Sequence, residues 1–307
     1  MLFYIAKRLI QALFVVFVVT LLVAWAIRLS GDPAVMLAGS GNLSPQDLDN
    51  IRQALGLNQP FWVQYGRFIL GLLHGQFGFS FVGHRSVGHM IAQALPATLE
   101  LAVSSLVLSI IIALPLGMLA AIYRGGKLDQ IIRVVSLVGL SFPNFWLALL
   151  LVLFFSITLG WLPPSGADSG AGLILPSLTM AIILSAINVR LVRTTMLETL
   201  NSQYILVARG KGLSEWQVLF KHALRNAAIP LVTYLGLQFG SLVGGIVVIE
   251  QVFSWPGMGS LAFDAISNRD YAVLQGSVTV LALLVIGVNL VVDLLYGLID
   301  PRIRHER

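Results

Sequence analysis

The sequence contains no cysteine and very little charge. Without cysteine, the chain can form no disulfide, no thiolate nucleophile and no zinc or iron–sulfur site with cysteine ligands. Charged residues make up 11% of the 307 residues, against about 25% in a soluble protein. Because so few charges cannot cover a water-exposed surface, the composition argues against a soluble enzyme, a nucleic-acid binder and a disordered protein.

Hydrophobic residues, in contrast, make up 57% of the chain, and the mean hydropathy is +0.87. Such a chain belongs in a lipid bilayer, whose core of about 30 Å is crossed by a helix of about 20 apolar residues. Six segments reach or approach that length, namely 9–28, 97–122, 131–159, 172–192, 227–253 and 272–298. We therefore predict an all-α fold, a polytopic membrane protein with six transmembrane helices in a single domain over residues 1–307.

The distribution of Lys and Arg predicts how these segments are oriented. An even number of spans places both termini on one side, and with the termini in the cytoplasm fourteen of the nineteen basic residues are cytoplasmic. The five on the outer side are Arg28, Arg52, Arg67, Arg85 and Arg269. This excess follows the positive-inside rule. We expect cytoplasmic termini, external loops at 30–96 and 254–271, and a cytoplasmic loop at 194–226.

The first apolar segment has an alternative interpretation as a cleaved signal peptide. Lys7 and Arg8 precede it, and Ala24-Trp25-Ala26 has the small residues of a cleavage site. Its apolar run from Leu9 to Ile27 is longer than the roughly 7–15 residues of a signal peptide. We therefore expect a retained span.

Motifs for an energy source or a catalytic site are also missing. Gly126-Lys127 is the nearest fragment to a phosphate-binding loop, but Leu128 follows it and Ala121 occupies the position of the first glycine. The predicted spans hold few ionisable residues away from their ends, whereas a proton-coupled transporter needs an intramembrane relay. We expect no catalytic residue, and any uphill transport must draw its power from another protein.

The external histidines His74, His84 and His89 raise the question of a metal site, since imidazole binds nickel, copper and zinc. Their spacings match no compact ligand motif. We expect no metal site in this chain.

The cytoplasmic loop at 194–226 has the pattern of two short helices joined by a glycine turn. The segment from Thr194 to Arg209 fits a continuing helix, and Gly210-Lys211-Gly212 offers glycines for the positive φ that ends a helix. Ser214 and Gln217 then have the spacing of a capping box.

An apolar stripe follows on the second short helix of this loop. Trp216, Leu219, Phe220 and Ala223 recur at helical spacing on a basic segment. Such a helix can lie on anionic lipid or dock into a groove of a soluble partner. The pattern alone does not choose between them.

Small residues recur on one face of the fifth predicted span. Gly236, Gly240 and Gly244 are spaced four apart, with Ser241 beside them. This face either allows a second helix to approach closely or lines a pore, and the sequence leaves both open. In the sixth span, Asn289 and Asp293 share a face, where interhelical hydrogen bonding and a ligand or gating role are the alternatives.

The loop resembles a known family. The run Ala208-Arg209-Gly210-Lys211-Gly212-Leu213-Ser214, continued by the run from His222 to Pro230, resembles the EAA loop of ABC-importer permeases of the dipeptide, oligopeptide and nickel subfamily. The EAA triplet is degenerate here, as Leu206-Val207-Ala208. Other stretches that resemble this subfamily are Gly31-Asp32-Pro33, Leu55-Gly56-Leu57-Asn58-Gln59-Pro60, Pro143-Asn144-Phe145-Trp146, Trp161-Leu162-Pro163, Trp255-Pro256-Gly257-Met258-Gly259, Arg269-Asp270-Tyr271 and Asp300-Pro301-Arg302-Ile303-Arg304. Gln76 and Ala272 depart from the pattern.

The resemblance implies a type I ABC-importer permease in the bacterial inner membrane. It implies a heterodimer with a second homologous permease, two ATP-binding subunits and an extracytoplasmic solute-binding protein. ATP and Mg are expected on the partner subunits, with no cofactor bound by this chain. Peptides, nickel and metal chelates are the implied cargo, and the stretches 143–148 and 186–191 lean slightly towards nickel-type relatives. The alternative is an ATP-independent channel or secondary carrier.

The residues expected to contact the ATP-binding subunits all lie in the cytoplasmic loop. They are Ala208, Gly210, Lys211, Gly212, Leu213, Ser214, Glu215, Trp216, His222, Arg225 and Asn226. The residues expected in the pore or at helix contacts are Gly236, Gly240, Ser241, Gly244, Asn289 and Asp293. Lipid is the only other expected partner, and nucleic acid is not.

Overall fold

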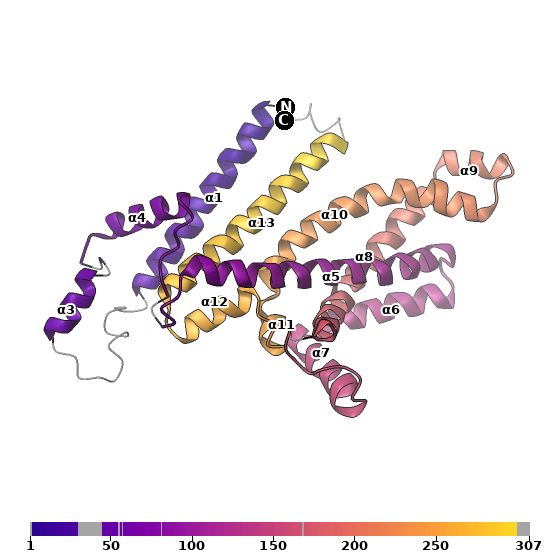
Figure 1. The fold of residues 1–307 in the computed structure, drawn as a ribbon. Helices are drawn as coiled ribbons and strands as arrows, with labels where there is room; N and C mark the ends of the chain where they lie inside the picture. Colours follow the sequence, from indigo (N-terminus) through magenta and orange to yellow (C-terminus); the bar gives the residue numbers. More distant parts are fainter. Residues whose placement is uncertain are drawn as a thin grey trace. The chain divides into compact units, whose positions relative to one another are not determined.

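The computed structural model describes residues 2–29, 45–54, 56, 58–80, 82–167 and 169–299. Within these residues every regular element is a helix, apart from one isolated bridge between Phe79 and Ser86 (Figure 1). The all-α prediction is therefore confirmed for the described part of the chain.

The helices follow one another with short connections. In chain order they are α1 (Leu2–Leu29), α3 (Pro45–Ala54), α4 (Phe61–Leu73), α5 (Val87–Ile122), α6 (Lys127–Ser141), α7 (Asn144–Leu151), the π-helix η1 (Val152–Thr158), the 3₁₀ helix η2 (Gly170–Leu173), α8 (Ile174–Leu200), α9 (Gln203–Gly210), the π-helix η3 (Gln217–Ala223), α10 (Leu224–Gly245), α11 (Val247–Val252), α12 (Met258–Ser267) and α13 (Tyr271–Ile299).

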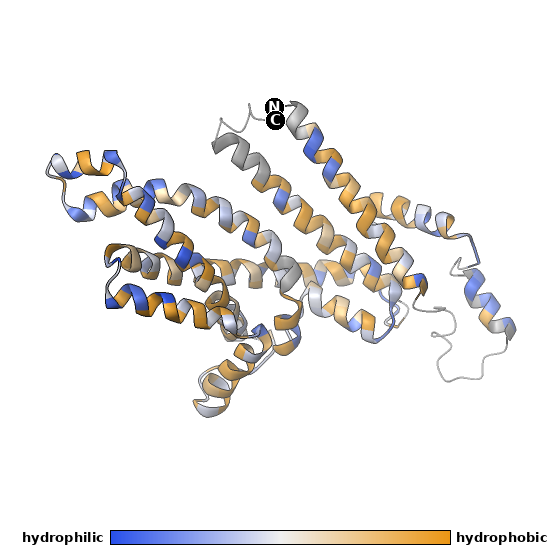
Figure 2. Cartoon of the chain, turned by 180° about the vertical axis from the view of Figure 1, so that it is seen from behind, coloured by the Kyte–Doolittle hydropathy of each residue, from blue (hydrophilic) through white to orange (hydrophobic). Residues whose placement is uncertain are grey.

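Several helices are long and apolar enough to cross a bilayer. Among the described residues four qualify by length and composition, namely Ala6–Leu29, Val87–Ile122, Gly170–Leu200 and Tyr271–Val292. A fifth is counted if Lys127–Ser141 and Asn144–Thr158 form one span bent by 104°. In Figure 2, α1 is hydrophobic along most of its length, whereas α3 is mainly hydrophilic. The chain is thus a multi-pass membrane protein.

The helix bounds differ in detail from the predicted spans. Helix α5 begins at Val87 and runs through Pro96, where the sequence suggested a start at residue 97. Proline is tolerated in a membrane helix because neighbouring groups satisfy the carbonyl that it leaves free. Over the fifth predicted span, α10 and α11 are separated at Ile246, and the segment 254–271 contains α12.

The chain divides into two compact units, and α5 and α13 contribute to both. One unit comprises residues 1–98 and 256–290. Its apolar core contains Val87, Ile91, Met258 and Val273. The carboxylate of Asp270 accepts a hydrogen bond from the Ser80 hydroxyl and one from the Val273 amide (3.3 Å), which fixes the start of α13. The same carboxylate therefore joins the chain before α5 to α13.

The other unit comprises residues 99–255 together with the segment that begins at Val291. Helix α8 is central to it, because α6, α7 and α10 all pack against α8. One apolar cluster of this unit includes Met196 of α8, Ile205 of α9, Val218 of η3 and Leu231 of α10. The cytoplasmic loop predicted at 194–226 is therefore part of the core of this unit.

Candidate functional site

The loop between α8 and α10 folds as a compact hairpin of two short helices. Helix α8 continues to Leu200, the chain turns at Asn201-Ser202, and α9 follows. Figure 1 shows α9 beyond the ends of α8 and α10, beside the turn that leads to η3. Contacts of η3 with α8, α9 and α10 hold the hairpin together.

Gly212 ends α9 in the conformation that the sequence predicts. Its φ is +76°. The Gly212 amide donates to the Arg209 carbonyl (2.9 Å), and the Leu213 amide donates to the Ala208 carbonyl (3.4 Å). These two bonds make a Schellman motif, in which glycine is favoured because the left-handed conformation strains other residues. The turn direction of the loop therefore depends on Gly212.

The start of the second helix also follows the prediction. The Gln217 amide donates to Ser214 Oγ, and the Ser214 amide donates to Gln217 Oε1, each at 3.4 Å. This reciprocal pair is the predicted capping box. Across the turn, Arg209 makes two hydrogen bonds to the Glu215 carboxylate, at 2.8 and 3.2 Å. The Arg209–Glu215 ion pair thus connects the helix before Gly212 with the helix after it.

One face of the hairpin is buried against the membrane helices. Ile205, Val218 and Ala223 are fully buried, and Ala208 is nearly so. They pack in one cluster with residues of α5, α8 and α10, including Met196. Helical residues run without a break from Glu215 through η3 into α10. The short helix and α10 therefore form one continuous helical segment.

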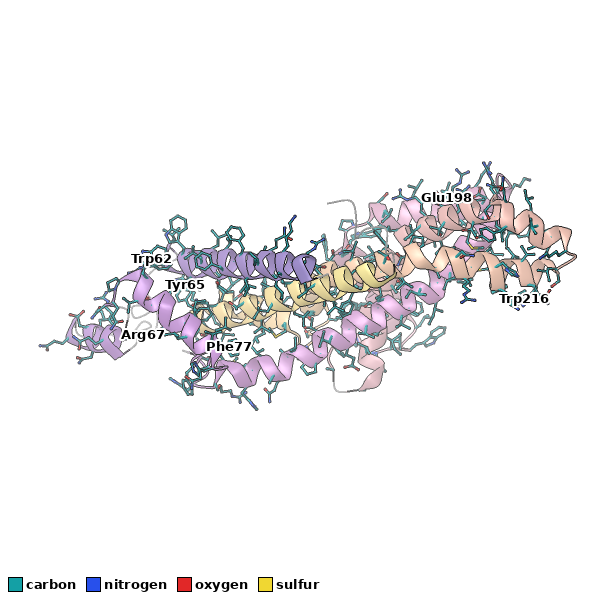
Figure 3. The ribbon with its side chains drawn as sticks, turned by 90° about the horizontal axis from the view of Figure 1, so that it is seen from above. Trp62, Tyr65, Arg67, Phe77, Glu198 and Trp216 are labelled. Carbon is teal, nitrogen blue, oxygen red and sulfur yellow. The ribbon has the colours of Figure 1, made fainter. Side chains whose placement is uncertain are left out.

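The opposite face carries exposed aromatic side chains. Trp216 is 69% exposed and Phe220 is 40% exposed, and their ring centroids are 3.9 Å apart. Figure 3 labels Trp216 on the hairpin. Tyr204 and Leu206 of α9 are exposed as well. The predicted stripe therefore divides: Trp216 and Phe220 form an outer apolar surface, whereas Ala223 belongs to the core.

The remaining predicted loop residues lie around this surface. Lys211, Glu215 and Arg225 are exposed. Asn226 is also exposed and donates from Nδ2 to the His222 carbonyl at 2.9 Å. Gly210 is exposed with open space around its Cα. The outer face therefore combines two aromatic rings with charged and polar side chains; aromatic residues are enriched in protein interfaces, whose rim is polar.

A buried ion pair close in sequence to the end of α8 was not foreseen. The Arg193 guanidinium donates to both carboxylate oxygens of Asp129, from Nε at 2.7 Å and Nη2 at 2.8 Å. Asp129 is fully buried and also accepts the Gly125 amide at 2.9 Å. Arg133 approaches the same carboxylate at 3.4 Å. The available signal was a lone acid among the basic residues between Arg124 and Arg133.

A polar cluster within the apolar part of this unit was also missed. Asn188 of α8 donates from Nδ2 to Ser109 Oγ of α5 (3.1 Å) and to Gln238 Oε1 of α10 (3.0 Å). All three side chains are buried. Three long helices are thus joined through one amide. The available signal was Gln238, a polar residue between Gly236 and Gly240 in an apolar segment.

The predicted pore and packing residues fall in different environments. A Cβ on Gly236 would lie 2.6 Å from Cγ2 of Val292, so α10 and α13 approach closely there. Gly240 is buried and Asn289 is half-buried, whereas Ser241 is exposed and donates to the Leu237 carbonyl at 3.3 Å. The surroundings of Gly244 and of the Asp293 side chain lie outside what the structure describes.

Comparison with known proteins gives consistent matches over the chain. The family model described as binding-protein-dependent transport system inner membrane component matches residues 113–305, and the model of the corresponding N-terminal region matches residues 1–102. The glutathione transport system permease protein GsiC of Escherichia coli K12 is 42% identical over 307 residues, which is 100% of both chains. GsiC of Shigella flexneri serotype 5b is likewise 42% identical over 100% of both chains.

Solved structures show the same kind of fold. An inward-facing structure of the MetNI methionine ABC transporter matches with a TM-score of 0.60 at 20% identity, covering 69% of this chain and 96% of that one. A chain of an amino acid ABC transporter crystallised with histidines matches with a TM-score of 0.54 at 13% identity, covering 67% and 92%. At these identities the matches establish the fold alone.

Proposed function

Because the chain belongs to the family of binding-protein-dependent transport system inner membrane components, as an ABC-importer permease of the peptide family, we propose that it forms one half of a pathway for short peptides across the bacterial inner membrane. A second, homologous permease forms the other half. The glutathione permeases that are 42% identical favour a small peptide of that class as cargo. Nickel and metal chelates are the other cargo that the subfamily resemblance implies, and only the stretches 143–148 and 186–191 lean towards nickel-type relatives.

In this proposal the chain crosses the membrane six times, and both termini are cytoplasmic. The bent pair of α6 with α7 and η1 forms one span, and α10 with α11 forms another. The excess of Lys and Arg on the loops assigned to the cytoplasm supports this orientation. The hairpin of α9 and η3 then faces the cytoplasm.

Two ATP-binding subunits supply the energy, with ATP and Mg bound to them. A solute-binding protein delivers the cargo from the outer side. The absence from the sequence of a phosphate-binding loop supports this division of labour. The family description itself names transport that depends on a binding protein.

The hairpin acts as a lever in this mechanism. The rings of Trp216 and Phe220 enter a cleft of an ATP-binding subunit, and the rest of the hairpin stays packed on α8 and α10. When ATP closes the two ATP-binding subunits, they pull on the hairpin, and the continuous helix from Glu215 into α10 moves with it. The membrane helices then exchange inward- and outward-facing states, because the partner's contacts differ between the two.

One observation carries this proposal most directly: two large apolar rings are exposed on a helix whose other face is fully buried. Trp216 and Phe220 have ring centroids 3.9 Å apart, so they form one contiguous apolar patch on the hairpin, and such patches mark interaction sites. Aromatic side chains in such positions commonly dominate a protein interface, each contributing about 2 kcal/mol or more.

The experiment compares Trp216→Ala with Trp161→Ala, which removes a tryptophan of similar exposure (70%) from another loop. Each variant is reconstituted with the partner subunits in proteoliposomes, and peptide uptake and ATP hydrolysis are measured. We expect Trp216→Ala to lose uptake by roughly ten-fold or more, with the permease still inserted, and Trp161→Ala to retain it. Equal uptake by both variants would contradict the lever.

The rival function, an ATP-independent channel or secondary carrier, is tested with the same material. The permease chains alone, without ATP-binding subunits, are placed in liposomes with a peptide gradient. We expect no uptake. Transport by the chains alone would replace the importer proposal with the rival.

A further inference from the structure

Helix α4 is fastened to α1 by a buried tyrosine. Tyr65 Oη and Thr20 Oγ1 are hydrogen-bonded at 2.8 Å, and both residues are buried. Tyr65 Oη also donates to the Phe17 carbonyl at 3.3 Å. The Tyr65 ring, labelled in Figure 3, meets the Phe17 ring edge-on and stacks on Phe61 of its own helix, with ring centroids 6.0 and 6.1 Å apart. This contact fixes α4 against the apolar helix α1 at the level of Thr20.

Beside this contact the two helices line an open pocket of about 600 Å³. Its lining consists of Leu21, Leu22, Trp25 and Arg28 from α1 and of Phe61 and Trp62 from α4. Five of these six side chains are apolar or aromatic, and one is a cation. The guanidinium of Arg28 lies 5.7 Å from the centre of the Phe61 ring, a cation–π contact.

The position of the pocket along α1 points to a boundary between lipid and water. Arg28 lies in the last turn of a helix that is apolar enough to span a bilayer. Trp25 and Trp62, which are 55% and 66% exposed, form the rim. Tryptophan is enriched at the depth of lipid head groups, because its ring is apolar and its N–H needs a polar partner.

The positive charge of Arg28 indicates that the pocket binds an anionic group. No carboxylate pairs with Arg28 among the residues that the structure describes. A planar guanidinium binds phosphate through two parallel hydrogen bonds. The volume lies in the range of about 300–1,000 Å³ that suits a small molecule, and a protein partner needs a much larger surface.

We propose that this pocket is a binding site for one phospholipid with an anionic head group. Arg28 binds the phosphate, Trp25 and Trp62 lie at the level of the head group and glycerol, and an acyl chain packs against Leu21 and Leu22. The bound lipid fills the space between α1 and α4. The site goes beyond the transport function, and it does not depend on which cargo the importer carries or on which side of the membrane Arg28 lies.

The test uses the permease assembled with its partner subunits in nanodiscs. Two photoactivatable probes are compared, phosphatidylglycerol and phosphatidylcholine with the same reactive acyl chain, and the labelled peptides are identified by mass spectrometry. We expect labelling of the peptides around Leu21–Trp25 and Trp62 to be roughly five-fold stronger with phosphatidylglycerol. Arg28→Gln should abolish this preference, and Arg28→Lys should keep most of it.

Arg67→Gln is the matched control, because it removes an exposed arginine from α4 outside the pocket. It should leave the preference unchanged. Equal labelling by both probes in the wild-type protein would show ordinary bilayer lipid only and overturn the proposal. A second result would also overturn the proposal: labelling at the pocket that shows no preference between the probes and falls when the solute-binding protein is added, because a protein would then cover the pocket.

If Arg28→Gln does not assemble, Trp62→Ala at the pocket rim is used in its place. A loss of preference for phosphatidylglycerol in that variant supports the lipid site, and an unchanged preference overturns it.

Discussion

The Asp129 carboxylate and the Arg193 guanidinium form a two-point ion pair between α6 and α8, with N–O distances of 2.7 and 2.8 Å. Asp129 is fully buried and Arg193 is 19% exposed in its side chain. Helix α6 follows α5 after a short turn, and the Gly125 amide of that turn binds the same carboxylate. One acid therefore ties the turn and the first turn of α6 to the helix that leads into the α9–η3 hairpin.

Removing one partner of this pair is expected to destabilise the protein. Asp129→Asn leaves the guanidinium without its counter-charge, and Arg193→Gln leaves a buried carboxylate, which costs about 3–5 kcal/mol for a fully buried pair. We expect about 3 kcal/mol here, because Arg193 is partly exposed. Chemical denaturation of the purified complex measures it.

The double variant Asp129→Asn/Arg193→Gln separates the pair from its members. It removes both charges, so its loss should be smaller than the sum of the single losses. Arg133→Gln is the control, since this half-exposed arginine lies at 3.4 Å and should cost about 1 kcal/mol or less. Additive single losses would mean that the two residues do not stabilise the protein as a pair.

Gly212 offers a test of the hairpin turn. A Cβ at this position would meet open space, so substitution acts only through the positive φ of +76°. Gly212→Ala should cost about 1–2 kcal/mol in that conformation and should shift the turn towards other backbone angles. We expect coupled peptide uptake to fall several-fold while membrane insertion is retained.

Gly210→Ala separates the backbone angle at Gly212 from added side-chain bulk on the same surface, which is expected to contact the ATP-binding subunits. Gly210 is the last residue of α9, has open space around it and has no positive φ. Alanine there should be neutral or slightly stabilising, since alanine favours the helix. Similar losses of uptake for both substitutions would show that side-chain bulk at the surface matters, not the backbone angle.

The parts of this hairpin that the sequence predicted are those determined by neighbouring residues. Gly212 and the Ser214–Gln217 pair act over three or four positions, and such spacing is visible in the sequence alone. The Asp129–Arg193 pair joins residues 64 positions apart, so no local pattern contains it. The same limit explains why the apolar stripe was treated as one surface: only packing on α8 and α10 separates exposed Trp216 from buried Ala223.

The helix bounds show a similar division. Apolar runs predict where a span lies, because the bilayer requires a minimum length. They do not predict that α5 starts at Val87, since its first turns are fixed by packing of Val87 and Ile91 against Met258.

Asn188 is expected to hold three membrane helices together. Asn188→Ala removes its hydrogen bonds to Ser109 and Gln238 and leaves two buried polar groups without them. Interhelical hydrogen bonds in membranes contribute about 0.6–2 kcal/mol each. We expect a loss of about 1–3 kcal/mol in chemical denaturation. Ser241→Ala, which removes an exposed hydroxyl bonded only within α10, should change stability little; a comparable loss there would refute a specific role of Asn188.

Gly236 distinguishes helix packing from pore lining. A Cβ at this position would lie 2.6 Å from Cγ2 of Val292, and β-branched valine has little freedom to move aside. Gly236→Ala should therefore force α10 and α13 apart and cost about 1–3 kcal/mol, as overpacking generally does. Gly287→Ala in α13 should be neutral, because nothing lies within 4 Å of its added Cβ.

The decisive variant is Gly236→Ala/Val292→Ala, which makes room for the new methyl group and should recover part of the lost stability in chemical denaturation. A glycine that lines a pore would behave differently. Gly236→Ala would then reduce uptake without loss of stability, and adding Val292→Ala would not restore uptake.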